Sequence, residues 1–182
     1  LRVAVAGNIA PAALDVLRTR LVECGEVPDP ERLPQVWVLE LSSFQLALTQ
    51  SLAPDAAAIL NLSQDHLDWH ATMASYTAAK QRIYRGARLC VWNRDDALTE
   101  PPRGPQRASF GSSLPGALDE FGIAHDGGLR WLAYAVAGDD PPPTRRRPQP
   151  VTIVVKRMMP ADALRIRGAH NHANALAALA LA

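Results

Sequence analysis

The chain has 182 residues, 48% of them hydrophobic and 20% charged, and its formal net charge at pH 7 is +1. This length and composition are typical of a globular chain with one domain, two at most. A nearly neutral chain gives no reason to expect a nucleic acid or a membrane surface as partner, and no apolar run is long enough to span a bilayer. Cys24 and Cys90 lack metal or redox spacing, so we interpret them as buried thiols of a reducing, cytoplasmic protein.

Short apolar runs alternate with helical patterns in the first half of the chain. We expect strands at residues 2–7, 36–42, 56–63 and 87–93. We expect helices at residues 8–23 and 75–84. Continuous apolar strands separated by helices are typical of a parallel sheet with both faces covered.

The second half of the chain has shorter elements. Strand patterns occur at residues 107–111, 127–138 and 151–158, and a proline-rich loop is expected at 139–150. A final helix begins near residue 168. The predicted fold class is therefore α/β, a mostly parallel sheet with helices on both faces and a small antiparallel edge sheet.

One charged residue shares the apolar face of the helix at 75–84. Tyr76, Ala79, Ile83 and Tyr84 recur at the three-and-four spacing of a stripe that faces a core, and Lys80 falls on the same stripe. A lysine stem can lie along the edge of a core with its ammonium in water. From the helix alone, this interpretation is favoured over a functional one.

Polar side chains follow two of the apolar runs, where open α/β sheets bind their ligands. Glu40 is a carboxylate within an apolar strand, which is expensive to bury unless it pairs with Arg or Lys or binds a metal. Asp65, His66, Asp68 and His70 follow the next strand. Oxygen ligands suit magnesium, whereas several histidines suit zinc, so either metal is open at this point.

The start of the last helix carries Asn171 and Asn174, three residues apart on one face. Carboxamides offer a donor and an acceptor together, which fits the edge of a nucleobase. Asparagines that cap a helix are the commoner case. No G-x-x-x-x-G-K-[ST] loop occurs, so a triphosphate cradle would lie outside this chain.

Taken in order, several segments resemble the Mur ligases of peptidoglycan synthesis. They are GNIA, VLELSSFQL, ILNLSQDHLDWH, YTAAKQRIY, NRDDALT, SFG and GAHNHANALAALALA. The resemblance runs from about Gly7 to the last residue, and ELSSFQL is its most specific part. It departs at Ala10, where the family usually has glycine.

The resemblance implies that residues 1–182 are the central ATP-binding domain, of a P-loop NTPase-like fold. The phosphate loop, an N-terminal UDP-binding domain and a C-terminal domain would lie outside it, so that this stretch alone would be inactive. The implied activity is ATP-dependent amide synthesis, which joins D-glutamate to UDP-N-acetylmuramoyl-L-alanine through an acyl phosphate. The implied protein is a cytoplasmic monomer that uses ATP and Mg²⁺.

The resemblance also implies roles for the metal-handling residues. Glu40 would ligate the magnesium that spans the ATP phosphates, and His66 would ligate a second magnesium. Lys80 would be carbamylated, and its new carboxylate would help to place that second ion. A lysine held inward favours the neutral amine that attacks carbon dioxide, so the helix position fits this modification.

Five further residues would bind the organic substrates. Asn171 and Asn174 would hold the adenine of ATP. Asn8, Ser42 and Gln45 would contact the UDP-muramoyl substrate.

Two other functions stay open. A sister amide ligase, either another Mur enzyme or a folylpolyglutamate synthase, would share the lysine but lack SSFQL. A zinc-dependent hydrolase built on Asp65, His66, Asp68 and His70 would hold zinc tightly and bind no nucleotide.

Overall fold

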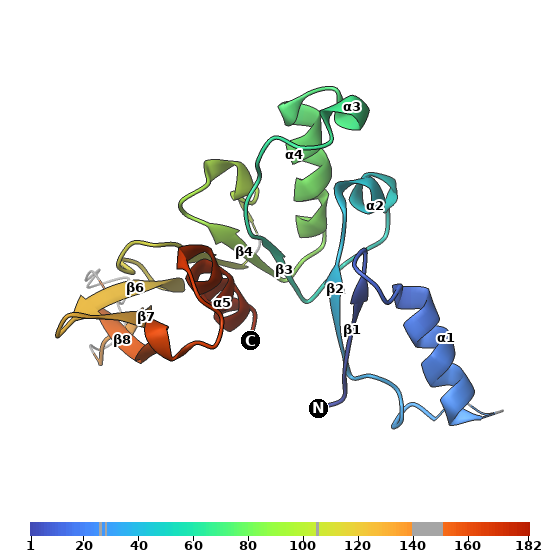
Figure 1. Ribbon diagram of the computed structural model, residues 1–182, viewed down its shortest axis with the longest axis horizontal. Helices are drawn as coiled ribbons and strands as arrows, with labels where there is room; N and C mark the ends of the chain where they lie inside the picture. The colour runs from blue at the N-terminus through green and yellow to red at the C-terminus, as the bar shows by residue number, and fades with distance from the viewer. Residues whose placement is uncertain (26, 28, 105, 140–150) are drawn as a thin grey trace, which may run out of the picture. The chain divides into compact units, whose positions relative to one another are not determined.

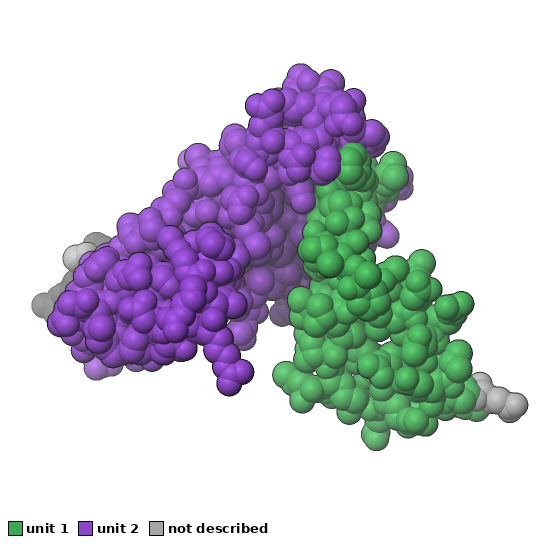
Figure 2. Space-filling model, in the orientation of Figure 1, with its two compact units in different colours: residues 1–49 green, residues 50–182 purple. Residues whose placement is uncertain are grey.

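The computed structural model describes residues 1–25, 27, 29–104, 106–139 and 151–182. They form two compact units, residues 1–49 and 50–182 (Figure 2). Of the proline-rich loop expected at 139–150, residues 140–150 lie outside the described ranges. Within them, no helix has the length and apolar character needed to cross a bilayer.

The first unit is a two-stranded parallel sheet with two helices. Its elements are β1 (Val3–Gly7), α1 (Ala13–Cys24), β2 (Val36–Glu40) and α2 (Ser43–Leu48). Helix α1 begins later than expected because the residues after β1 form a turn, in which Gly7 N–H donates to the Pro11 carbonyl at 3.0 Å. The helix ends before Gly25, whose φ of 89° suits a glycine beyond a helix C-terminus.

The second unit contains a six-stranded sheet in the order β3-β4-β5-β6-β7-β8. The strands are β3 (Ala56–Ile59), β4 (Leu89–Asn93), β5 (Gln106–Phe110), β6 (Glu120–Asp126), β7 (Leu129–Ala137) and β8 (Ile153–Pro160). The first four run parallel, and β7 and β8 are antiparallel to their neighbours. The α-helices are α3 (Leu67–His70), α4 (Met73–Gln81) and α5 (Ala169–Leu181), and the 3₁₀ turns are η1 (Arg82–Tyr84), η2 (Ala97–Thr99) and η3 (Ala161–Ala163) (Figure 1).

Two neighbouring residues of β4 show that this sheet is covered on both faces. Cys90 and Val91 are both fully buried, and side chains alternate across a strand. Val91 belongs to a core cluster with Leu176 of α5, whereas Cys90 belongs to a second cluster with Tyr76 and Tyr84 of the α4–η1 segment. The expected α/β fold with helices on both faces is confirmed.

The antiparallel part of the fold is larger than the sequence indicates. β6 was not anticipated, and it pairs with β7 along its whole length while joining β5 through two residues. Gly122 interrupts its apolar pattern, but a side chain there is excluded because a Cβ atom would lie 2.1 Å from the Ser113 carbonyl oxygen. The antiparallel strands therefore continue the parallel sheet at its edge.

Candidate functional site

The carboxylate of Glu40 lies at the end of β2, beside the turn that follows β1. Asn8 N–H donates to the Glu40 carbonyl at 2.8 Å, and Ile9 N–H donates to Glu40 Oε2 at 3.0 Å. Gly7 is opposite Glu40 in the sheet, and a Cβ atom at Gly7 would lie 2.0 Å from the Glu40 carbonyl oxygen. Glycine at position 7 thus allows the turn to reach the carboxylate. Ala10 lies within this turn and is exposed.

Glu40 is exposed, whereas the sequence suggested a carboxylate buried within a strand. The difference arises because β2 ends at Glu40, so the side chain stands at the rim of the sheet. Within the described residues of the first unit, Glu40 forms no ion pair with an arginine. The pairing interpretation therefore gains no support, and a metal role stays open.

Ser42 and Gln45 form a capping box at the start of α2. Gln45 N–H donates to Ser42 Oγ at 3.3 Å, and Ser42 N–H donates to Gln45 Oε1 at 2.9 Å. This arrangement satisfies two backbone donors at the helix terminus. It also fixes both side chains shortly after Glu40 along the chain.

His66 occupies a constrained position between β3 and α3. It is the residue before the first turn of α3, with φ of 52°, and its Nε2 atom lies 3.3 Å from Asp65 Oδ2. A left-handed backbone at a residue other than glycine costs about 1–2 kcal/mol, and such positions cluster at functional sites. His66 N–H also donates to Asp65 Oδ1 at 2.8 Å, so the carboxylate of Asp65 holds both the backbone and the ring.

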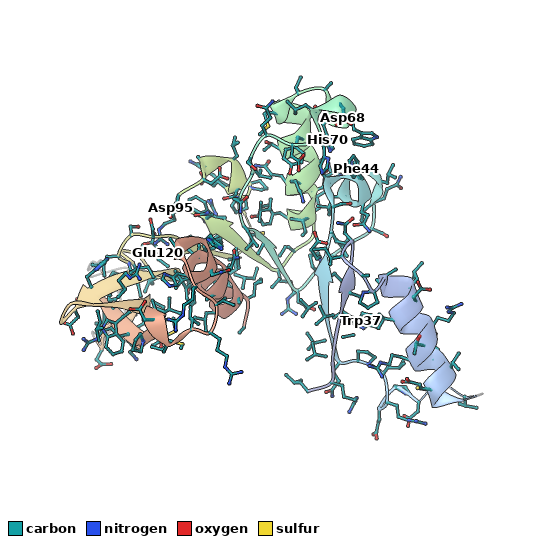
Figure 3. All side chains as sticks on the ribbon, in the orientation of Figure 1. Trp37, Phe44, Asp68, His70, Asp95 and Glu120 are labelled. Carbon is teal, nitrogen blue, oxygen red and sulfur yellow. The ribbon has the colours of Figure 1, made fainter. Side chains whose placement is uncertain are left out.

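Asp68 and His70 lie on α3 (Figure 3). His70 is buried, and its ring makes edge contacts with Trp69 and Tyr76 at centroid distances of 4.5 and 5.3 Å. It is therefore a core histidine. Across the described ranges, no three His, Cys, Asp or Glu side chains converge to hold a metal ion, so the predicted zinc site gains no support.

Lys80 lies in the last turn of α4 and is half-buried, between the buried Ala79 and the half-buried Gln81. The apolar stripe is confirmed, because Tyr76, Ala79 and Tyr84 are all buried. Burial raises the pKa of the Tyr76 phenol, and the negative charge of Asp65 raises it further. The ring contact between His70 and Tyr76 places α3, which follows His66, beside the helix that carries Lys80.

Asn171 and Asn174 lie at the start of α5, as the sequence predicts. Asn171 is half-buried, and its Nδ2 donates to the Arg167 carbonyl at 2.7 Å, whereas Asn174 is exposed. The Arg167 bond ties the side chain to the segment before the helix, but it is not a capping bond, because a capping side chain accepts from a backbone N–H and Asn171 donates to a carbonyl. Gly168, with φ of 101°, is the residue before the first turn.

The sequence analysis gave no role to the turn that follows β4. Asn93 Nδ2 donates to the Leu60 carbonyl at 2.9 Å, and Asp96 Oδ2 accepts from Leu62 N–H at 2.6 Å. Gln81 Nε2 donates to the Leu98 carbonyl at 3.0 Å. The signal for this turn was an asparagine and two aspartates directly after a strand, a pattern that favours side-chain bonds to nearby backbone.

Comparisons with known proteins agree on one family. The family model of the Mur ligase middle domain matches residues 29–109. Over an alignment of 196 positions, the chain is 50% identical to "UDP-N-acetylmuramoylalanine--D-glutamate ligase" of Burkholderia mallei strain SAVP1 and of Burkholderia pseudomallei strain 668. Each alignment covers 100% of this chain and 38% of the relative, so the chain spans well under half the length of these curated relatives.

Proposed function

Because this chain belongs to the Mur ligase family, we propose that residues 1–182 are the central ATP-handling domain of a longer ligase. The longer protein would form the amide bond between D-glutamate and UDP-N-acetylmuramoyl-L-alanine, with ATP as the energy source and an acyl phosphate as the intermediate. The observation that carries this proposal is the 50% identity along the entire chain to proteins named for this reaction. We further propose that the protein works as a monomer in the cytoplasm, and that the phosphate loop and the D-glutamate site lie outside this stretch.

Glu40 and His66 are the proposed magnesium ligands. The residues fit such ions, because Glu40 has one oxygen held by Ile9 N–H and no ion pair with a described arginine of the first unit, and because Asp65 orients the ring of His66. When bound, Mg²⁺ would supply the positive charge that lets a carboxylate meet a triphosphate. Glu40 is the last residue of β2 and the capping-box residues follow it closely, which favours the binding of an anionic substrate near the ion.

Lys80 would act as a carbamate. Its half-buried position on an apolar stripe brings the lysine inward, and carbamylation turns a cation that repels Mg²⁺ into a carboxylate that attracts it. The residues of this chain would thus hold and position anionic oxygens. Positioning and charge stabilisation provide most of the rate acceleration in phosphoryl transfer.

The organic substrates would be held by the other five residues. Asn171 and Asn174 would bond the adenine edge, and Asn8, Ser42 and Gln45 would contact the UDP-muramoyl group. The bond from Asn171 to the Arg167 carbonyl competes with the adenine role, so the asparagines need their own test. Asn171→Leu with Asn174→Leu should raise the Kd for ATP and leave that for the muramoyl substrate unchanged, because the hydrogen-bond partners of the base are lost. A fall in thermal stability with unchanged ATP affinity would assign them to capping alone.

The decisive experiment uses Lys80 in the complete ligase, assayed for phosphate release that depends on D-glutamate. Lys80→Ala should reduce turnover to near background, and short-chain carboxylic acids should restore part of it because they fit the vacated space. Lys80→Arg is the matched control, which should not be rescued because the guanidinium fills that space with a fixed charge. Full activity of Lys80→Ala would refute the carbamate role, and the absence of D-glutamate-dependent turnover in the wild type would refute the proposed function.

A further inference from the structure

The turn between β4 and β5, here called the β4 turn (residues 93–100), contacts the loop that leads to His66. Leu62 N–H donates to Asp96 Oδ2 at 2.6 Å, and Asn93 Nδ2 donates to the Leu60 carbonyl at 2.9 Å. Both contacted residues lie in the segment between β3 and α3, which ends at His66. Side chains of the β4 turn therefore hold this segment at two backbone positions.

The same turn contacts the helix of Lys80. Gln81, the residue directly after Lys80, donates through Nε2 to the Leu98 carbonyl at 3.0 Å and to the Glu100 carbonyl at 3.3 Å. The hydroxyl of Tyr84, one turn further along, lies 2.9 Å from the Thr99 carbonyl. The end of α4 is thus bonded to the backbone carbonyls of residues 98–100 in the same turn.

Hydrogen bonds within the β4 turn connect its contacts with the His66 loop to its contacts with the end of α4. Thr99 is fully buried, its Oγ1 accepts from Asn93 N–H at 3.0 Å, and Asp96 Oδ1 accepts from Leu98 N–H at 3.1 Å. The carboxylate of Asp96 therefore bridges the turn and the His66 loop, one oxygen to each. Bonds from backbone N–H to a carboxylate are shorter and stronger than neutral ones, which suits a positioning role.

We propose that Asp96 and Gln81 are positioning residues that set His66 against Lys80 through the β4 turn. This inference rests on the proposed function, because it assumes that these two side chains act together on a metal ion. A displacement of about 1 Å at such a site can cost on the order of a hundredfold in rate. If these contacts served stability alone, their removal would lower the unfolding temperature without changing how the enzyme responds to Mg²⁺.

Asp95 supplies the matched control. It is the neighbour of Asp96 in sequence, and its Oδ2 accepts from Ser112 N–H at 2.7 Å, so it makes the same kind of bond to a loop that carries none of the proposed ligands. In Figure 3, Asp95 lies after β4, the strand from which the turn leaves. Asp95→Asn therefore weakens the bond to Ser112 N–H, whereas Asp96→Asn at the adjacent position weakens the bonds to Leu62 N–H and to Leu98 N–H.

In the complete ligase, the measurements are kcat, the KM for ATP and the Mg²⁺ concentration that gives half-maximal rate. For Asp96→Asn we expect kcat to fall about 10- to 100-fold and the Mg²⁺ requirement to rise severalfold, with the KM for ATP within twofold of wild type. Gln81→Met should change the same two quantities less, because it preserves the apolar stem and removes only the amide. Asp95→Asn should stay within about twofold of the wild type. Equal kcat and equal Mg²⁺ dependence in the two aspartate variants would overturn the proposal.

A second measurement, amide hydrogen exchange in the 182-residue chain, does not depend on activity. Asp96→Asn should speed exchange at residues 62–66 and leave β5 unchanged, whereas Asp95→Asn should leave residues 62–66 unchanged. Unchanged exchange at 62–66 in Asp96→Asn would overturn the proposal even if activity fell. If the complete wild-type ligase shows no D-glutamate-dependent turnover but the exchange pattern is as expected, the proposed function is refuted and the link from Asp96 to the His66 loop stands.

Discussion

Tyr84→Phe removes one hydroxyl from the interior of the second unit. Tyr84 is 3% exposed, and its hydroxyl lies 2.9 Å from the carbonyl oxygens of both Val91 and Thr99. The first belongs to strand β4, and the second to η2. A single hydroxyl therefore ties the end of the Lys80 helix segment to the sheet and to the β4 turn.

The expected cost follows from the groups left behind. The phenyl ring still fills the site, so no cavity forms, but the two carbonyls lose a buried donor. An unsatisfied buried polar group costs about 1–3 kcal/mol, and the hydroxyl has only one proton to share between two acceptors. We expect a loss of about 1–2 kcal/mol in the free energy of unfolding, which corresponds to about 2–8 °C in Tm for a chain of this length.

The assay is urea unfolding of the 182-residue chain, followed by circular dichroism, with Tyr134→Phe as control. Tyr134 is half-buried and stacks on Phe121 at 5.9 Å, and no bond from its hydroxyl occurs within the described residues. This control should differ from the wild type by less than about 0.5 kcal/mol. If Tyr84→Phe unfolds as the control does, the two contacts contribute no net stability and the reasoning fails.

Three further predictions concern the same unit. Burial, with a smaller contribution from Cys90, raises the pKa of Tyr84 above its ordinary value of 10.0. Above pH 10 the unfolded chain loses a proton that the folded chain keeps, so the free energy of unfolding should fall with rising pH, by up to about 1.4 kcal/mol per pH unit from this residue. Urea titrations repeated between pH 9 and 11 should show a shallower fall in Tyr84→Phe. Leu176→Ala, at a site 1% exposed, should cost about 2–5 kcal/mol in urea unfolding, whereas Leu179→Ala, 38% exposed, should cost well under half of that; equal losses would show that α5 does not pack on the sheet as described. Gly122→Ala should lower Tm by several degrees because its Cβ would meet the Ser113 carbonyl oxygen at 2.1 Å. Gly116→Ala is the control that should not, because its Cβ would lie 4.0 Å from the nearest atom, Glu120 Oε2.

The sequence by itself determined the fold class and the order of the main elements. The apolar run 87–93 is continuous because both faces of the parallel sheet are buried at β4, and this pattern can be recognised without knowledge of any contact. The run 36–42 also predicts a strand, although most residues of β2 are exposed. The stripe of Tyr76, Ala79 and Tyr84 could also be predicted from the sequence, because residues on one face of a helix recur at a fixed spacing. The resemblance rested on local segments, and the comparisons bear it out.

Only the tertiary structure decided how side chains distant in sequence are used. The exposure of Glu40 depends on where β2 stops, and β6 depends on the pairing of a glycine-containing segment with β7 rather than on its own pattern. His70 and His66 look alike in sequence, but one ring packs on Tyr76 and the other is held by Asp65. The link from Asp96 to Leu62 joins residues 34 positions apart. Periodicity reports which face of an element is apolar, whereas such a bond depends on how β3 and β4 are placed side by side, and that placement is a property of the folded sheet.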